Sequence, residues 1–159
     1  MNTFNFHMKI KSSSSKMIRG VDWFGIVSYQ CSKSSPGPYG LSGQCVEFAR
    51  RWLSTVKYSS FESVDSAVDI WKLTHATRLG KKVAFQSISV HQVPQLGDLA
   101  IYDRHPGSPY GHVAVVIGVY NRSVFLSEQN WSDKKWTGYA RCEHMDQFHS
   151  YLIGWKRIH

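Results

Sequence analysis

The chain has 159 residues, of which 42% are hydrophobic and 19% are charged. This length and composition suit a single globular domain with a substantial core. No run of about 18 apolar residues predicts a membrane-spanning segment, and the N-terminus lacks the run of about 7–15 that a signal peptide needs. We therefore expect a cytoplasmic protein.

The charge and the cysteines narrow the classes of partner. The net charge of +8 could favour nucleic acid, an anionic cell-wall polymer or an acidic membrane surface. The basic residues are scattered, whereas a nucleic-acid-binding surface is clustered, so we expect no nucleic-acid partner. Three cysteines without the spacing of metal ligands favour neither a disulfide framework nor a metal site.

In chain order, the first segment is a basic, serine-rich stretch over residues 1–20, which predicts a flexible lead-in to a single domain over 21–159. Val21 to Tyr29 is apolar enough to form a short strand. The prolines and glycines of residues 32–43 then predict a loop without a regular element.

Two helices are predicted next, followed by an antiparallel sheet. Apolar residues at helical spacing predict one helix from Ser42 or Gly43 to about Lys57, and a second from Val64 to Leu79, which Gly80 ends. β-Branched and aromatic runs predict strands over Ala84–Val90, Asp98–Tyr102, His112–Tyr120, Val124–Glu128, Trp136–Arg141 and Ile153–Ile158. Helices followed by antiparallel strands indicate an α+β fold, with N-terminal helices packed on a C-terminal sheet.

Cys45 is the strongest candidate for a functional residue, because it lies where a glycine-rich loop becomes a helix. The N–H groups and the dipole at a helix N-terminus favour thiolate over thiol, and the same N–H groups can stabilise an oxyanion. Gln44 could donate a further N–H to that oxyanion. The alternative interpretation is a buried helix cysteine without chemistry.

His112, Glu128 and Asn130 could complete a cysteine–histidine hydrolase site. His112 opens a predicted strand after a turn and is the candidate base, with Glu128 as the preferred group to orient it and Asn130 in support. A three-residue turn over residues 121–123 would place all three on one face of the hairpin, whereas a two-residue turn would place Glu128 on the opposite face. Arg50 could bind a substrate carboxylate, or it could be a surface arginine.

The sequence resembles the cysteine, histidine-dependent amidohydrolase/peptidase family, known as the CHAP domain, and particularly the amidase domain of glutathionylspermidine synthetase/amidase enzymes. The stretch Gln44-Cys45-Val46-Glu47-Phe48-Ala49-Arg50-Arg51 is the most specific part of the resemblance, joined by Gly97–Tyr102, Gly111–Ala114 and Glu128–Asn130. The resemblance implies a papain-like fold with Cys45 as nucleophile, His112 as base and Glu128 as third member. It also suggests that Arg50 meets the glycyl carboxylate of a glutathionyl group.

The expected activity is hydrolysis of a small peptide-like amide without a metal or organic cofactor. The resemblance favours the amide between glutathione and spermidine as substrate. Peptidoglycan peptide bonds are the alternative, which the basic composition supports because cell walls are anionic. A non-catalytic binding module or a redox-responsive protein on the same fold is a third interpretation.

Overall fold

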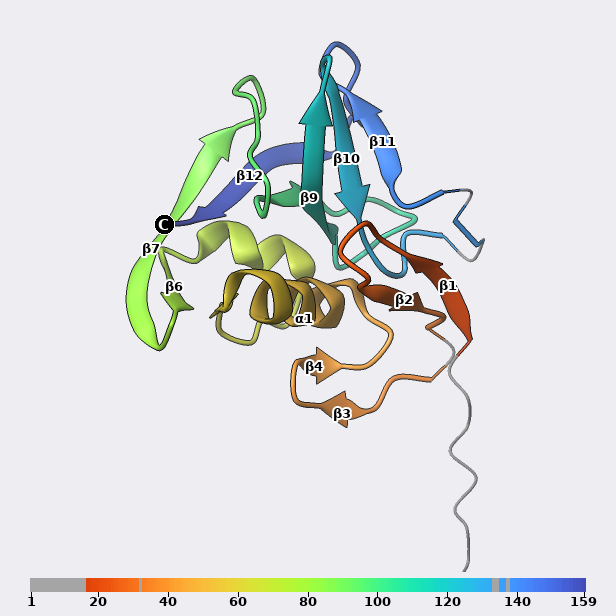
Figure 1. Cartoon of the computed structure of the whole chain (residues 1–159), viewed down its shortest axis with the longest axis vertical. Helices are drawn as coiled ribbons and strands as arrows, with labels where there is room; N and C mark the ends of the chain where they lie inside the picture. The colour runs from red at the N-terminus through yellow and green to blue at the C-terminus, as the bar shows by residue number, and fades with distance from the viewer. Residues whose placement is uncertain (1–16, 32, 133–134, 137) are drawn as a thin grey trace, which may run out of the picture.

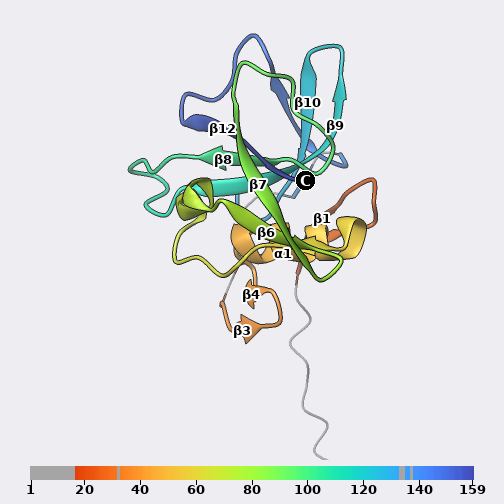
Figure 2. The ribbon, with the colours of Figure 1, turned by 90° about the vertical axis from the view of Figure 1, so that its left-hand side faces the viewer.

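The computed structural model describes residues 17–31, 33–132, 135–136 and 138–159. One α-helix, α1 (Cys45–Lys57), packs against a strongly twisted antiparallel sheet of eight strands (Figures 1 and 2). In sheet order the strands are β11 (Arg141–His144), β10 (Ser123–Ser127), β9 (His112–Tyr120), β8 (Leu99–Tyr102), β12 (Leu152–Ile158), β7 (Lys81–Ser89), β6 (His75–Arg78) and β5 (Ser59–Ser60). The described residues are thus mostly sheet, and the α+β prediction is correct only in part.

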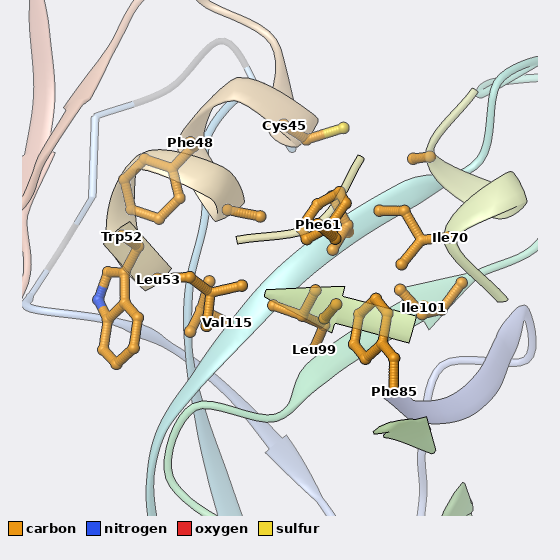
Figure 3. Packing of buried hydrophobic residues seen from close by; sticks show 14 of the residues in the cluster. Cys45, Phe48, Trp52, Leu53, Phe61, Ile70, Phe85, Leu99, Ile101 and Val115 are labelled. Atoms are coloured by element: carbon orange, nitrogen blue, oxygen red, sulfur yellow. The ribbon is translucent and has the colours of Figure 1, made fainter. Parts of the chain in front are cut away.

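The hydrophobic core has one layer on each side of the central strands. Alternating residues of β8 and β9 form the first layer, where Leu99 and Val115 meet Phe48, Trp52 and other apolar residues of α1 (Figure 3). The second layer contains the intervening residues of the same strands and Trp155 of β12. Because both faces of β8 and β9 are buried, the start of each strand has a fixed position relative to α1.

The predicted second helix, Val64–Leu79, is wrong. Only a short 3₁₀ helix, η1 (Ala67–Lys72), forms there, and the chain then continues as β6, which pairs with β7. Leu79 and Gly80 both have positive φ (49° and 75°) and make the two-residue turn of this hairpin. The glycine that was expected to end a helix instead supplies the backbone conformation of a tight hairpin turn.

The N-terminal part also differs from the prediction. Residues 1–16 of the predicted lead-in lie outside the described residues, while Ile18–Val21 forms β1 and Val27–Tyr29 forms β2. These two strands replace the single strand predicted over Val21–Tyr29. A second small pair, β3 (Pro36–Gly37) and β4 (Gly40–Leu41), lies in the predicted loop (Figure 1).

The remaining elements agree more closely with the prediction. The first helix begins at Cys45 rather than at Ser42 or Gly43, so the cysteine is its first residue. The strands at Ala84–Val90, Asp98–Tyr102, Val124–Glu128 and Ile153–Ile158 differ from the observed strands by one to three residues at their ends. The strand expected over Trp136–Arg141, which includes a residue outside the described set, is wrong: β11 begins only at Arg141.

The register of the β9–β10 hairpin combines a two-residue turn with a bulge. Asn121 and Arg122 form the turn with φ of 47° and 63°, so Ser123 pairs with Tyr120. One further residue on β9 shifts the register between Phe125 and Leu126, and Leu126 is then opposite Val116. The bulge reverses the change of face that the short turn would cause, so Glu128 returns to the face of His112.

Asp22 ties the β1–β2 hairpin to both the helix and the sheet. Its buried carboxylate accepts the backbone N–H groups of Phe24 and Ile26 at 2.9 and 3.0 Å. It also accepts the indole N–H of Trp52 at 2.8 Å and the hydroxyl of Ser127 at 2.6 Å. The buried carboxylate therefore has four donors from three separate elements.

No helix in the described part of the chain is long and apolar enough to cross a membrane.

Replacing Asp22 by Ala is expected to lower the free energy of unfolding by about 2–4 kcal/mol, because buried donors lose their acceptor. Urea denaturation followed by circular dichroism would measure the change. Asp146→Ala is the matched control, since its ion pair with Arg122 is exposed and should contribute little. Equal stability of the Asp22 variant and the wild type would contradict this account of the hairpin.

Candidate active site

The fold places Cys45 at the first position of α1, next to the end of β10. Gln129, which is 1% exposed, holds the two together. Its Nε2 donates to the backbone oxygen of Gln44 at 3.1 Å and to Oε2 of Glu47 at 2.9 Å, while its Oε1 accepts the N–H of Tyr29 at 2.8 Å. Sequence reasoning missed this residue, although it adjoins the predicted Glu128.

His112 is the first residue of β9 and is 5% exposed. Gly111 precedes it with φ of +68°, and a Cβ there would lie 2.5 Å from the backbone oxygen of Tyr102. Only glycine allows this close approach of the turn to β8. His112, the first residue of β9, is therefore paired with Tyr102, the last residue of β8.

Cys45 and His112 interact directly, and each changes the pKa of the other. Burial raises the pKa of Cys45, but the charge and hydrogen bond of His112, together with the N–H groups of Val113 and Val46, lower it below its usual value. Burial lowers the pKa of His112, but the Cys45 thiolate and then Glu128 outweigh it and raise the pKa to about 9. Together these shifts favour a thiolate–imidazolium pair near neutral pH.

Glu128 lies behind His112, as the sequence predicted. Its Oε1 is 3.5 Å from Nε2 of His112, which is long for a hydrogen bond, so the contact acts mainly through charge. Burial raises the pKa of Glu128, but His112 and Arg141 outweigh this effect and hold it below the usual value. The carboxylate therefore stays ionised and favours the protonated form of His112.

Arg141 was not predicted as a site residue. Its Nε lies 2.8 and 2.7 Å from the two carboxylate oxygens of Glu128. Its other nitrogens donate to Glu143 at 2.7 Å and to the hydroxyl of Tyr102 at 2.8 Å. The guanidinium also lies over the ring of Trp131, 3.9 Å from the centroid. The sequence signal for Arg141 was weak, because this residue was the last one of the strand wrongly predicted over Trp136–Arg141.

Gln44 and Asn130 contact each other beside the nucleophile. Nδ2 of Asn130 donates to Oε1 of Gln44 at 3.2 Å, so the structure joins Asn130 to Gln44 rather than to His112. Nε2 of Gln44 donates to Ser34 at 3.0 Å and approaches the sulfur of Cys31 at 3.4 Å. The side chain of Gln44 is thus fixed at the N-terminus of α1.

Arg50 extends from α1 into the cleft that also contains Cys45 and His112. Its Nε donates to the backbone oxygen of Phe61 at 3.1 Å, and its Nη1 to that of Tyr39 at 2.9 Å. These bonds give Arg50 a structural role. Nη2 makes no hydrogen bond with the described residues, and it remains able to meet a ligand.

A cleft of about 890 Å³ brings together most of the predicted site residues: Gln44, Cys45, Arg50, His112 and Asn130. Glu128 instead lines a neighbouring cavity of about 320 Å³ with Arg141, and the two hollows share Asn130, Trp131 and Ser132. Among the described residues, no group of three or more His, Cys, Asp or Glu side chains could hold a metal ion. The arrangement is suited to nucleophilic attack by the thiolate in the larger cleft, with Glu128 supporting His112 from behind.

Two curated proteins of Crithidia fasciculata are similar in sequence. A glutathionylspermidine synthase is 33% identical over 103 residues, and a trypanothione synthetase is 32% identical over 101 residues. Each alignment covers 61% of this chain but only 14% and 16% of the respective relative. The chain therefore spans a small part of the length of these relatives.

The solved structures of Ly7917 share the fold. The crystal structure of Ly7917 has a TM-score of 0.51 at 16% identity, covering 74% of this chain and 53% of that one. Ly7917 with the hydrolysing product of MDP has a TM-score of 0.52 at 17% identity, covering 79% and 56%.

The sequence model of the CHAP domain matches residues 34–130, which include Cys45, His112 and Glu128. This match spans more than half of the chain and agrees with the fold of the solved structures. The chain belongs to the CHAP domain family, a family of amidases and peptidases.

Proposed function

We propose that this protein is a cysteine-dependent amide hydrolase with Cys45 as nucleophile, His112 as general acid and base, and Glu128 as the group that supports His112. The observation that carries the proposal is the pairing of two buried residues, Cys45 and His112, which both line the larger cleft at the N-terminus of α1. A buried cysteine without chemistry would have its pKa raised by burial, whereas here the net shift is downward.

The reaction follows from the positions of these groups. The Cys45 thiolate attacks the amide carbonyl carbon, and the carbonyl π electrons move to the oxygen. When the tetrahedral intermediate collapses, the C–N bond breaks and the departing nitrogen takes the proton of the His112 imidazolium. Neutral His112 then removes a proton from water, which attacks the thioester and releases the carboxylate and the Cys45 thiolate.

The oxyanion of the intermediate would lie at the N-terminus of α1. The backbone N–H of Cys45 has no hydrogen-bond partner among the described residues, whereas the amide of Gln44 beside it would have to release Ser34 or Cys31 before it could donate to the oxyanion. Backbone and amide N–H groups that are fixed before the reaction stabilise developing negative charge strongly. Asn130 would act through Gln44, whose amide it holds.

The proposed substrate is a glutathionylspermidine-type amide. The larger cleft is lined by two acidic residues, Glu47 and Asp65, and by one arginine, Arg50. The Glu47 carboxylate is paired with Arg51, so Asp65 and Arg50 are the remaining charges of opposite sign. A cleft with this balance accommodates a cationic amine better than the net charge of the whole chain suggests. The glycyl carboxyl is an amide in the intact conjugate, so Arg50 would meet it as a carboxylate only in the product.

Peptidoglycan peptide bonds are the second candidate. The observation in their favour is the likeness to Ly7917, which was solved with the hydrolysing product of MDP. MDP is a fragment of peptidoglycan. The net charge of +8 also favours an anionic polymer. The two substrates need the same nucleophile and differ in the charge of the amine side, which is cationic only in the polyamine conjugate.

Purified protein is expected to release spermidine from glutathionylspermidine faster than it cleaves MDP or longer peptidoglycan fragments, as measured by chromatography of the products. Cys45→Ala should lower turnover by about 10³-fold or more, because the thioester cannot form. Cys142→Ala is the matched control, since Cys142 is exposed and should leave turnover unchanged.

Faster cleavage of the peptidoglycan fragments would select the second candidate. Wild-type protein that hydrolyses neither substrate and whose Cys45 is alkylated as slowly as Cys142 near neutral pH would contradict the proposed hydrolase. A binding module would then be the better interpretation of the fold.

Turnover is expected to have a bell-shaped dependence on pH. It should fall on the acid side as the Cys45 thiolate gains a proton, at a pH below the usual range for a thiol. It should fall again above a pH of about 9, where His112 loses the proton that the departing amine needs. Alkylation of Cys45 by iodoacetamide requires only the thiolate and should not fall at high pH. A parallel fall of both rates above that pH would contradict the assigned role of His112.

A further inference from the structure

A buried network of charges stands behind Glu128, on the side away from Cys45. Glu128 is 2% exposed and Glu143 is 8% exposed, and the guanidinium of Arg141 bridges their carboxylates. Tyr102 donates its hydroxyl to Oε1 of Glu143 at 2.7 Å, while the backbone N–H of His149 donates to Oε2 at 3.0 Å. Every member of this network therefore has partners that fix its position.

The partners of Glu128 are unequal. Both of its oxygens lie within 2.8 Å of Nε of Arg141, whereas His112 is 3.5 Å away. Arg141, rather than His112, thus determines where the carboxylate lies. An isolated carboxylate at this depth would take up a proton, because burial disfavours its charged form.

The charges of Glu128, Glu143 and Arg141 do not cancel. Glu128 and Glu143 contribute two negative charges and Arg141 contributes one positive charge, so the three groups together carry −1. Glu143 offsets the charge of Arg141, and the negative charge of Glu128 remains available to His112. Protonated His112 balances these three groups, and the Cys45 thiolate paired with it leaves one negative charge at the site.

Few other charged groups face His112. Cys45 approaches it from α1 and Glu128 from the end of β10, while the ring of Tyr102 on β8 lies 5.8 Å away. The ring of Trp131 covers His112 at 4.9 Å. Burial and the two carboxylates keep Tyr102 protonated by raising its pKa against the effect of Arg141, so it serves as a neutral donor.

We infer that Arg141 is a positioning residue for the Cys45–His112 pair: with Glu143 and Tyr102 behind it, it holds the Glu128 carboxylate ionised and in place. This inference rests on the proposed function for its consequence in catalysis. Arg141 and Glu143 lie beyond residue 130, outside the segment that matches the CHAP domain. These two members of the supporting network come from β11, whereas Tyr102 lies inside the matched segment.

The test is the pH dependence of Cys45 alkylation by iodoacetamide, measured at each cysteine by mass spectrometry of the folded protein. In Arg141→Met, Glu128 should take up a proton and cease to support the imidazolium. The midpoint of Cys45 alkylation should then rise by roughly one pH unit, which makes alkylation about tenfold slower at pH values below both midpoints. Arg141→Lys should show a smaller rise, because it keeps the charge but loses the planar fork.

Glu143→Gln tests the charge count separately. It removes the negative charge that offsets Arg141, so the midpoint should also rise while Arg141 remains beside Glu128. Arg122→Met is the matched control, because it removes an exposed arginine ion pair from the β9–β10 turn next to β11 without reaching the site. Thermal unfolding of each variant would show that the alkylated protein is folded.

An unchanged or lowered midpoint in folded Arg141→Met and Glu143→Gln would overturn the inference. A purely structural role of Arg141 would lower the unfolding temperature without moving this midpoint. Alkylation needs no substrate, so it separates this inference from the proposed function. A shifted midpoint in a protein that hydrolyses neither amide would support the positioning role and reject both proposed substrates.

Discussion

The structure of the site depends on one constraint: the N-terminus of α1 must meet the first residue of β9 closely enough for Cys45 and His112 to share a proton. Both side chains are almost completely buried, so neither charge is stabilised by bulk water. Each charge is stabilised chiefly by the other, and a displacement of either element would favour the neutral forms of both. The surrounding contacts fix the two elements relative to each other.

Three sets of polar contacts provide this fixation from different directions. Gln129 fastens the N-terminus of α1 to the end of β10, and Asp22 fastens the middle of α1 to the same strand through Trp52 and Ser127. Behind His112, Arg141 holds Glu128. These buried groups are nearly all satisfied, and a satisfied polar network in a packed core specifies a single arrangement. The rigid frame lies on sheet and helix, while the cleft opens between loops.

The sequence was sufficient to predict α1 and the strands β7, β8, β9, β10 and β12, because residue types and local turns carry those signals. It also suggested Cys45 and His112 as nucleophile and base, which stay a proposal. Glu128 was placed on the correct face for an incomplete reason: the turn has two residues rather than three, and a bulge on β9 restores the alternation. Bulges depend on tertiary packing, so sequence periodicity does not reveal them. The second helix failed because apolar spacing over residues 64–79 also fits a short 3₁₀ helix followed by a strand. Arg141 was missed because its contacts with Glu128 and Tyr102 depend on the pairing of β11 with β10, and the strand containing Arg141 was misplaced.

The most direct test of the central claim is the ultraviolet difference titration of the Cys45 thiolate, comparing the wild type with Cys45→Ala. The thiolate–imidazolium pair predicts a thiolate signal that is already present near neutral pH, and that His112→Ala shifts to higher pH because the cationic neighbour is lost. A thiolate that forms only in the range of an ordinary cysteine, about pH 8.5, would contradict the account.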